Sequence, residues 1–158
     1  MLTPRTTLIL ALLVLSLVAI TLFPSAVAQN PVNPWSLSQT VQPGDLLKEL
    51  SEPKTAPTVL FVGFQRLYAA GHIKGAQYHG TGGSIEGIAQ IKSWAEPLPR
   101  SSNLVIYCGC CPMDRCPNIR PAFAALRDLG FTKLRVLVLP TSFEVDWAEK
   151  GFPYDKGQ

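Results

Sequence analysis

The stretch that decides the fold is YAAGHIKGA, which runs from Tyr68 to Ala76. Its first residues belong to the segment 64–70, which can form a short helix. Gly71 follows, and glycine is the type of residue at which helices end. Before it, the apolar run 58–62 predicts a strand buried on both faces. After it, residues 77–79 predict a short strand ahead of a glycine-rich turn. The stretch therefore lies between two predicted strands and includes the end of the helix that links them.

The same alternation continues on both sides of this stretch. Apolar residues recur at helical spacing in some segments and form short continuous runs in others. Strands that alternate with helices indicate a parallel sheet covered on both faces. The sequence thus predicts one α/β domain. Its further expected elements are helices at 45–50, 84–96, 120–129 and 143–150, and strands at 103–107 and 134–139.

YAAGHIKGA resembles the EYxxGHIxGA signature of rhodanese-like domains. The following order of a strand, a cysteine loop, a helix and a last core strand is similar to the second half of that family. Trp147 with Gly151-Phe152-Pro153 resembles its closing W…GxP. The resemblance implies a rhodanese-like three-layer α/β/α fold with a mainly parallel central sheet. It would cover residues 35–153, between an extended lead-in at 29–34 and a C-terminal tail at 154–158.

The resemblance also implies an activity. Members of the family are sulfurtransferases: a cysteine at the end of the central strand attacks a donor such as thiosulfate and becomes a persulfide. It then passes the sulfane sulfur to a thiol or another thiophilic acceptor, without a cofactor. By position, Cys108 is the implied nucleophile. The family's usual aspartate and arginine align here with Phe61 and Gly63, and the active-site loop is several residues longer.

The loop reads CGCCPMDRCPNIRP from Cys108 to Pro121, and it holds all four cysteines within nine residues. In parallel α/β sheets, reactive groups gather where strands end and the next helix begins. Backbone N–H groups and the positive end of that helix favour a thiolate and an anionic donor. Arg115 and Arg120 would add positive charge. We therefore expect Gly109, Arg115 and Arg120 to bind the donor.

A redox function is an alternative reading of the same loop. Cys108 and Cys111 have the Cys-x-x-Cys spacing of dithiol oxidoreductases. A persulfide on Cys108 could also be resolved by a neighbouring thiol, which would release sulfide and leave a disulfide. The sequence therefore also fits a thiol–disulfide or persulfide reductase that uses Cys108 with Cys111 or Cys116. Cys110, Cys111 and Cys116 are the candidate resolving residues.

Two further alternatives do not involve catalysis. Paired cysteines in exported proteins are often structural disulfides, although bridges within this loop would restrict the unfolded chain little. Four thiolates could instead bind a soft metal ion, as in a metal-binding module. Closed metal sites usually take ligands from two separate segments, and no further cysteine is present. We therefore assign no metal ligand from the sequence.

The N-terminus has the pattern of a secretory signal peptide. An apolar run at 7–23 follows Arg5, and Ala26-Val27-Ala28 offers a cleavage site, so residues 1–28 would be removed. We expect a periplasmic or secreted protein with no stable membrane span, rather than one held by an uncleaved anchor. Loss of Arg5 lowers the net charge from +3 to +2. This small excess, without a basic run, argues against a nucleic-acid partner.

Overall fold

The structure is a computed structural model that describes residues 35–157. The signal peptide expected at 1–28 and the lead-in expected at 29–34 lie outside these residues. Within 35–157, none of the helices is both long and apolar enough to span a bilayer.

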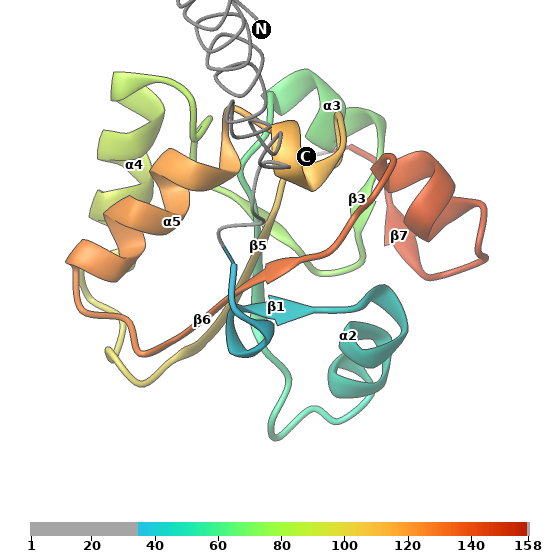
Figure 1. Ribbon diagram of the computed structural model, residues 1–158, viewed down its shortest axis with the longest axis horizontal. Coiled ribbons are helices and arrows are strands. Elements are labelled where there is room, and N and C mark those ends of the chain that lie inside the picture. Colours follow the sequence, from blue (N-terminus) through green and yellow to red (C-terminus); the bar gives the residue numbers. More distant parts are fainter. Residues whose placement is uncertain (1–34, 158) are drawn as a thin grey trace, which may run out of the picture. The chain divides into compact units, whose positions relative to one another are not determined.

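A central sheet of five parallel strands organises the described domain, in the order β1-β6-β5-β2-β4 (Figure 1). The strands predicted from apolar runs are confirmed, with small shifts at their ends. The fold class is confirmed as well, since the sheet is parallel and carries helices on both faces. The strands are β1 (Thr40–Val41), β2 (Thr58–Phe61), β4 (Gln77–Tyr78), β5 (Asn103–Tyr107) and β6 (Lys133–Leu137).

The helices lie where the apolar spacing predicts them. The start of α4 (Ile85–Ala95) is capped, since Ser84 accepts a hydrogen bond from the Gly87 N–H as the N-cap. The segment predicted as the last helix is a short π-helix. The elements are η1 (Leu37–Gln39), α2 (Pro43–Leu50), α3 (Gln65–Ala70), α4 (Ile85–Ala95), η2 (Met113–Arg115), α5 (Ile119–Asp128) and η3 (Glu144–Ala148).

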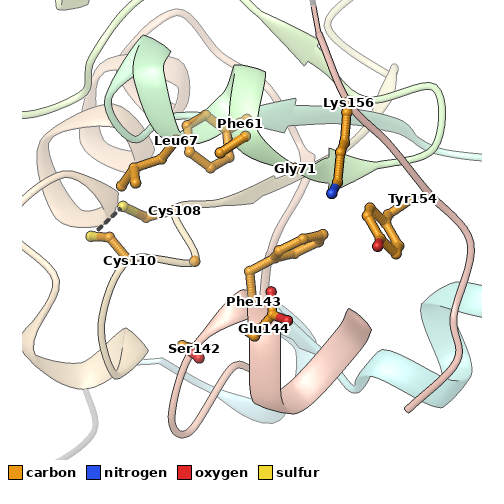
Figure 2. Close-up of a pocket in the computed structure, with 12 residues that line it drawn as sticks. Phe61, Leu67, Gly71, Cys108, Cys110, Ser142, Phe143, Glu144, Tyr154 and Lys156 are labelled. Atoms are coloured by element: carbon orange, nitrogen blue, oxygen red, sulfur yellow. Dashed lines mark hydrogen bonds between the residues drawn. The ribbon is translucent and has the colours of Figure 1, made fainter. Parts of the chain in front are cut away.

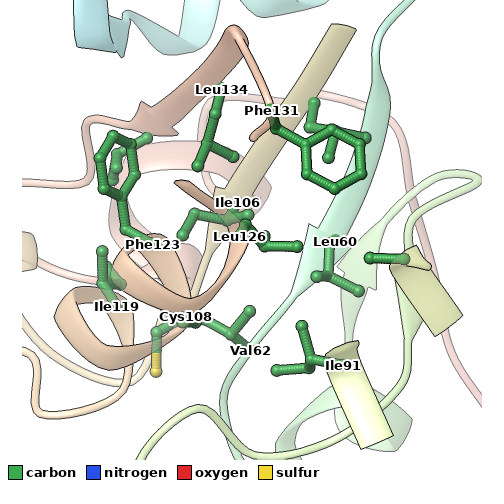
Figure 3. Packing of buried hydrophobic residues seen from close by; sticks show 14 of the residues in the cluster. Leu60, Val62, Ile91, Ile106, Cys108, Ile119, Phe123, Leu126, Phe131 and Leu134 are labelled. Atoms are coloured by element: carbon green, nitrogen blue, oxygen red, sulfur yellow. The ribbon is translucent and has the colours of Figure 1, made fainter. Parts of the chain in front are cut away.

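Successive side chains of the buried strands point to opposite faces of the sheet, so the domain has two apolar layers. On β5, Leu104 and Ile106 belong to an apolar cluster with residues of α4 and α5. Figure 3 shows Ile106 in this cluster, and Figure 1 shows the two helices on the same side of the sheet. Val105 and Tyr107 pack on the other face, with residues of α2, α3 and η3. This explains why the strands read as continuous apolar runs. Because both faces are covered, the reactive groups are confined to the sheet's edges and ends.

The segment expected as a C-terminal tail, 154–158, differs from that expectation. Tyr154–Asp155 forms β7, which pairs antiparallel with β3 (His72–Ile73) in a separate two-stranded sheet. The reason lies in the preceding residues, because the Trp147 indole N–H donates to the Pro153 carbonyl at 2.9 Å. This bond directs the chain back toward the GHIKGA segment. Packing of the domain thus continues past Pro153.

Candidate active site

The GHIKGA segment supports the strand that carries the cysteine loop. The Ile73 N–H donates to the Tyr107 hydroxyl at 2.9 Å, and the Tyr68 hydroxyl donates to the Ala76 carbonyl at 2.6 Å. The His72 ring stacks on the Tyr68 ring, with centroids 3.7 Å apart. Its Nδ1 lies 2.8 Å from the Tyr68 carbonyl oxygen. The segment therefore fixes the C-terminal end of β5, immediately before Cys108.

Cys108 occupies the carboxyl end of this central strand, beside the start of α5. Its side chain is only 1% exposed and belongs to the apolar cluster between the sheet, α4 and α5 (Figure 3). Gly63 lies against it: a Cβ there would come 3.0 Å from the Cys108 sulfur and 2.6 Å from Phe61 Cζ. No side chain fits at this position unless Phe61 moves. The strand end thus places the thiol in a tight, mostly apolar setting.

Three thiol groups meet around this position. The Sγ atoms of Cys108 and Cys110 are 3.0 Å apart (Figure 2), and those of Cys108, Cys110 and Cys116 all lie within 4.8 Å of one another. All four cysteines of the loop are free thiols. Cys111 lies outside the three-thiol group, with its Sγ 3.4 Å from that of Cys110. The group is close enough for thiol chemistry among its members, and one soft cation could contact all three sulfurs.

The surroundings of Cys108 favour its ionised form. A hydrogen bond from the Cys116 thiol, with others from Cys110 and the Asn118 amide, lowers the pKa of Cys108 to about 6 despite the opposing effect of burial. The Asn118 Nδ2 donates at 3.3 Å. The pKa of Cys116 is raised, mainly because its thiol donates to Cys108. The pKa of Cys110 is raised by burial and by Cys108. The Cys108 thiolate is therefore stabilised by hydrogen bonds from two protonated thiols, Cys116 and Cys110.

The Asn118 side chain is held in place by a turn distant in sequence. Its backbone is already in the helical region and its side chain makes no capping bond to α5. A Cβ on Gly82 would collide with the Asn118 carbonyl oxygen, and one on Gly83 would come 2.5 Å from Asn118 Oδ1. Only residues without side chains allow this close approach. The glycine-rich turn thus holds the amide that donates to Cys108.

A pocket of about 320 Å³ opens beside Cys108 and Cys110 (Figure 2). Its walls come from β2, α3, the cysteine loop, the start of η3 and the C-terminal segment. One acidic and one basic side chain, Glu144 and Lys156, contribute to them. The volume of the pocket is enough for a small molecule or ion. The lining residues are Phe61, Leu67, Ala70, Gly71, Cys108, Gly109, Cys110, Ser142, Phe143, Glu144, Tyr154 and Lys156.

Of the three residues expected to bind the donor, one lines the pocket and the two arginines do not. Gly109 lines the pocket with a positive φ of 76°, and its carbonyl accepts from the Phe143 N–H at 2.9 Å. Arg115 is exposed and lies 4.0 Å from the Asp114 carboxylate, and Arg120 donates to the Asp114 carbonyl at 3.0 Å. Neither arginine lines the pocket. A substrate-binding role for either stays a prediction, and Lys156 is the basic residue on the pocket wall.

The protonation of Cys108 gives a direct test of this geometry. Because its pKa is lowered to about 6, the thiolate forms as pH rises through 6 and persists above it. We expect the ultraviolet absorbance of the full-length protein to show one thiolate step there, well below the ordinary cysteine pKa of about 8.5. Asn118→Leu removes a donor to the thiolate and should shift this step to higher pH.

Asn103→Leu is the matched control, since this asparagine lies at the opposite end of β5. It should leave the step unchanged. A wild-type titration in which all four thiols ionise together near their ordinary pKa would contradict the proposed environment of Cys108.

No protein-family model and no curated protein matches the sequence, but solved structures do. The rhodanese-like domain of an Anabaena protein is 24% identical with a TM-score of 0.54, and covers 75% of this chain and 79% of that one. A protein from Bacillus halodurans is 21% identical with a TM-score of 0.60, over 76% and 78%. Thiosulfate sulfurtransferase from Pseudomonas aeruginosa is 27% identical with a TM-score of 0.56, over 75% and 19%.

The fold and the site together define an α/β domain with a buried cysteine at the end of its central parallel strand. That architecture is the rhodanese-like fold. The likeness to these structures, together with GHIKGA, supports the rhodanese-like family.

Proposed function

We propose that this protein transfers sulfane sulfur from a thiosulfate-type donor to a thiophilic acceptor through a persulfide on Cys108. The observation that carries the proposal is the surroundings of the Cys108 sulfur. It lies at the edge of an anion-sized pocket and receives hydrogen bonds from Cys116, Cys110 and Asn118. Such donors stabilise a thiolate, which is the nucleophilic form of cysteine. The named activity of the Pseudomonas relative agrees with this proposal.

The chemistry needs no external oxidant. The Cys108 thiolate attacks the outer sulfur of thiosulfate, the S–S bond of the donor breaks, and its electron pair leaves with sulfite. The acceptor then attacks the outer sulfur of the persulfide, and Cys108 returns as a thiolate. The groups that stabilise the thiolate act in both steps, because it is the nucleophile in the first and the leaving group in the second. Lys156 is the lining cation available to the anionic donor.

Intact mass of the full-length protein tests the proposal. We expect the reduced protein to gain the mass of one sulfur atom after incubation with thiosulfate, and to lose it on addition of cyanide. Fragmentation after alkylation should assign the extra sulfur to the loop that begins at Cys108. Protein that gains no sulfur under these conditions would contradict the proposal.

A reductase is the second candidate, and the distance of 3.0 Å between the Cys108 and Cys110 sulfurs supports it. The pairing would then involve Cys110 rather than Cys111, whose sulfur lies outside the three-thiol group. Loss of two hydrogens with release of sulfide in the mass experiment would favour this reading. A mass that falls on addition of a chelator would favour the soft-metal module.

A further inference from the structure

Cys108 and Cys110, two neighbouring thiols of the loop, differ sharply in exposure. Cys108 is 1% exposed, whereas Cys110 is exposed, although their sulfurs are only 3.0 Å apart. The change occurs across a single residue, Gly109, whose positive φ turns the chain between them. A chain of close sulfurs therefore leads from a buried nucleophile to the surface.

This arrangement limits what can reach Cys108. A small anion fits the pocket of about 320 Å³ beside the buried sulfur. The Cys108 residue is only 1% exposed, so the thiol of a folded protein cannot contact its sulfur unless the surrounding side chains move. Cys110 stands in the same pocket and is open to solvent. A small donor can therefore react at Cys108, whereas a large acceptor can contact only Cys110.

We propose that Cys110 is a second, transient carrier of the sulfur, which takes it from Cys108 and presents it to a protein thiol. The inference rests on the proposed function and adds to it the class of acceptor. Its basis is the close approach of the two sulfurs combined with their opposite exposure.

The transfer step balances without a further reactant. The Cys110 proton first moves to the outer sulfur of the Cys108 persulfide, which leaves Cys110 as the nucleophilic thiolate. Cys110 Sγ then bonds to that outer sulfur and the electron pair of the broken S–S bond returns to Cys108, so a Cys108 thiolate and a Cys110 persulfide result. An S–S bond is about 2.05 Å long, so the outer sulfur is at most about 5 Å from Cys110 Sγ. A small rotation of either side chain brings them into contact.

The hydrogen bonds at the site favour this direction of attack over disulfide formation. Attack on the outer sulfur expels Cys108, whose thiolate is stabilised by Cys116 and Asn118. Thiols that are better stabilised as thiolates leave faster. Attack on Cys108 Sγ would instead expel hydrosulfide and close a small Cys-Gly-Cys ring at the tight turn of Gly109. Transfer therefore needs less rearrangement of the loop than the disulfide does.

The test compares two acceptors with the full-length protein loaded from thiosulfate. The small probe is cyanide, and the large probe is a folded protein with one exposed cysteine. We expect Cys110→Ser to lower the ratio of the large-acceptor rate to the cyanide rate by about tenfold or more, since the direct route to Cys108 is obstructed. Serine keeps a hydroxyl donor beside Cys108. In the wild-type protein, alkylation and fragmentation should find extra sulfur on Cys110.

Cys111→Ser is the matched control, because its sulfur is close to Cys110 but outside the three-thiol group. It should leave the ratio unchanged. An unchanged ratio in Cys110→Ser, or extra sulfur confined to Cys108, would overturn the relay alone. A disulfide with released sulfide would overturn the relay and favour the reductase in place of the proposed transferase. If no cysteine gains sulfur in any variant, the proposed function fails and the relay fails with it.

Discussion

Replacement of Cys108 by serine is expected to lower kcat/KM for sulfur transfer from thiosulfate by about a thousandfold or more, because the reaction loses its nucleophile. Serine is nearly isosteric and can still accept the Asn118 hydrogen bond. Its hydroxyl, however, does not ionise near neutral pH and forms no persulfide. The measurement is the initial rate with thiosulfate and cyanide, compared at equal concentrations of folded protein.

Two controls separate this effect from a loss of structure. The thermal unfolding of Cys108→Ser should stay close to that of the wild type, because the substitution removes little volume from the core. Cys111→Ser should keep most of the activity, since its sulfur is outside the three-thiol group. Near-normal turnover in Cys108→Ser would remove the nucleophile from the proposal.

The largest effect on stability is expected at Trp147. Its side chain is fully buried, its indole N–H donates to the Pro153 carbonyl at 2.9 Å, and its ring packs edge-on against Phe152. Trp147→Ala should therefore reduce the free energy of unfolding by about 3–5 kcal/mol, through the cavity and the lost hydrogen bond. Urea denaturation followed by far-ultraviolet circular dichroism measures this difference.

Val145 provides the matched comparison on the same short helix, because its side chain is 37% exposed. Val145→Ala should change the free energy of unfolding by less than about 1 kcal/mol. The loss of free energy of unfolding in Trp147→Phe should lie between those of Trp147→Ala and Val145→Ala, because phenylalanine keeps an aromatic ring but removes the hydrogen bond. Equal stability of Trp147→Ala and Val145→Ala would show that η3 does not hold the C-terminal segment.

The main features of the fold are predictable because they depend on local patterns. The apolar runs at 58–62 and 103–107 are buried on both faces of a parallel sheet, as their composition indicates. β1 and β7 are not predictable in this way, since each has two residues and pairs with a partner distant in sequence. Tyr154–Asp155 carries no strand pattern of its own. Its place depends on the bond between Trp147 and Pro153.

The candidate site is predictable in its position but not in its contacts. The end of the strand at 103–107 places Cys108 where the rhodanese-like resemblance implies a nucleophile. Asn118 looks like an N-cap in the sequence, and only the approach of Gly83 from another turn directs its amide to the cysteine. Cys-x-x-Cys spacing favours Cys111 as the partner. The turn at Gly109 brings Cys110 there instead.

The pairing of β1 with β6 has a consequence for the order in which the chain can assemble. Thr40 lies opposite Val136 and Val41 opposite Leu137, so almost the whole described domain separates the two strands in sequence. A polypeptide is made from its N-terminus, and contacts between distant segments form slowly. Of the described strands, the one made first is therefore among the last to pair. Until it does, β6 is an open edge that another chain could pair with.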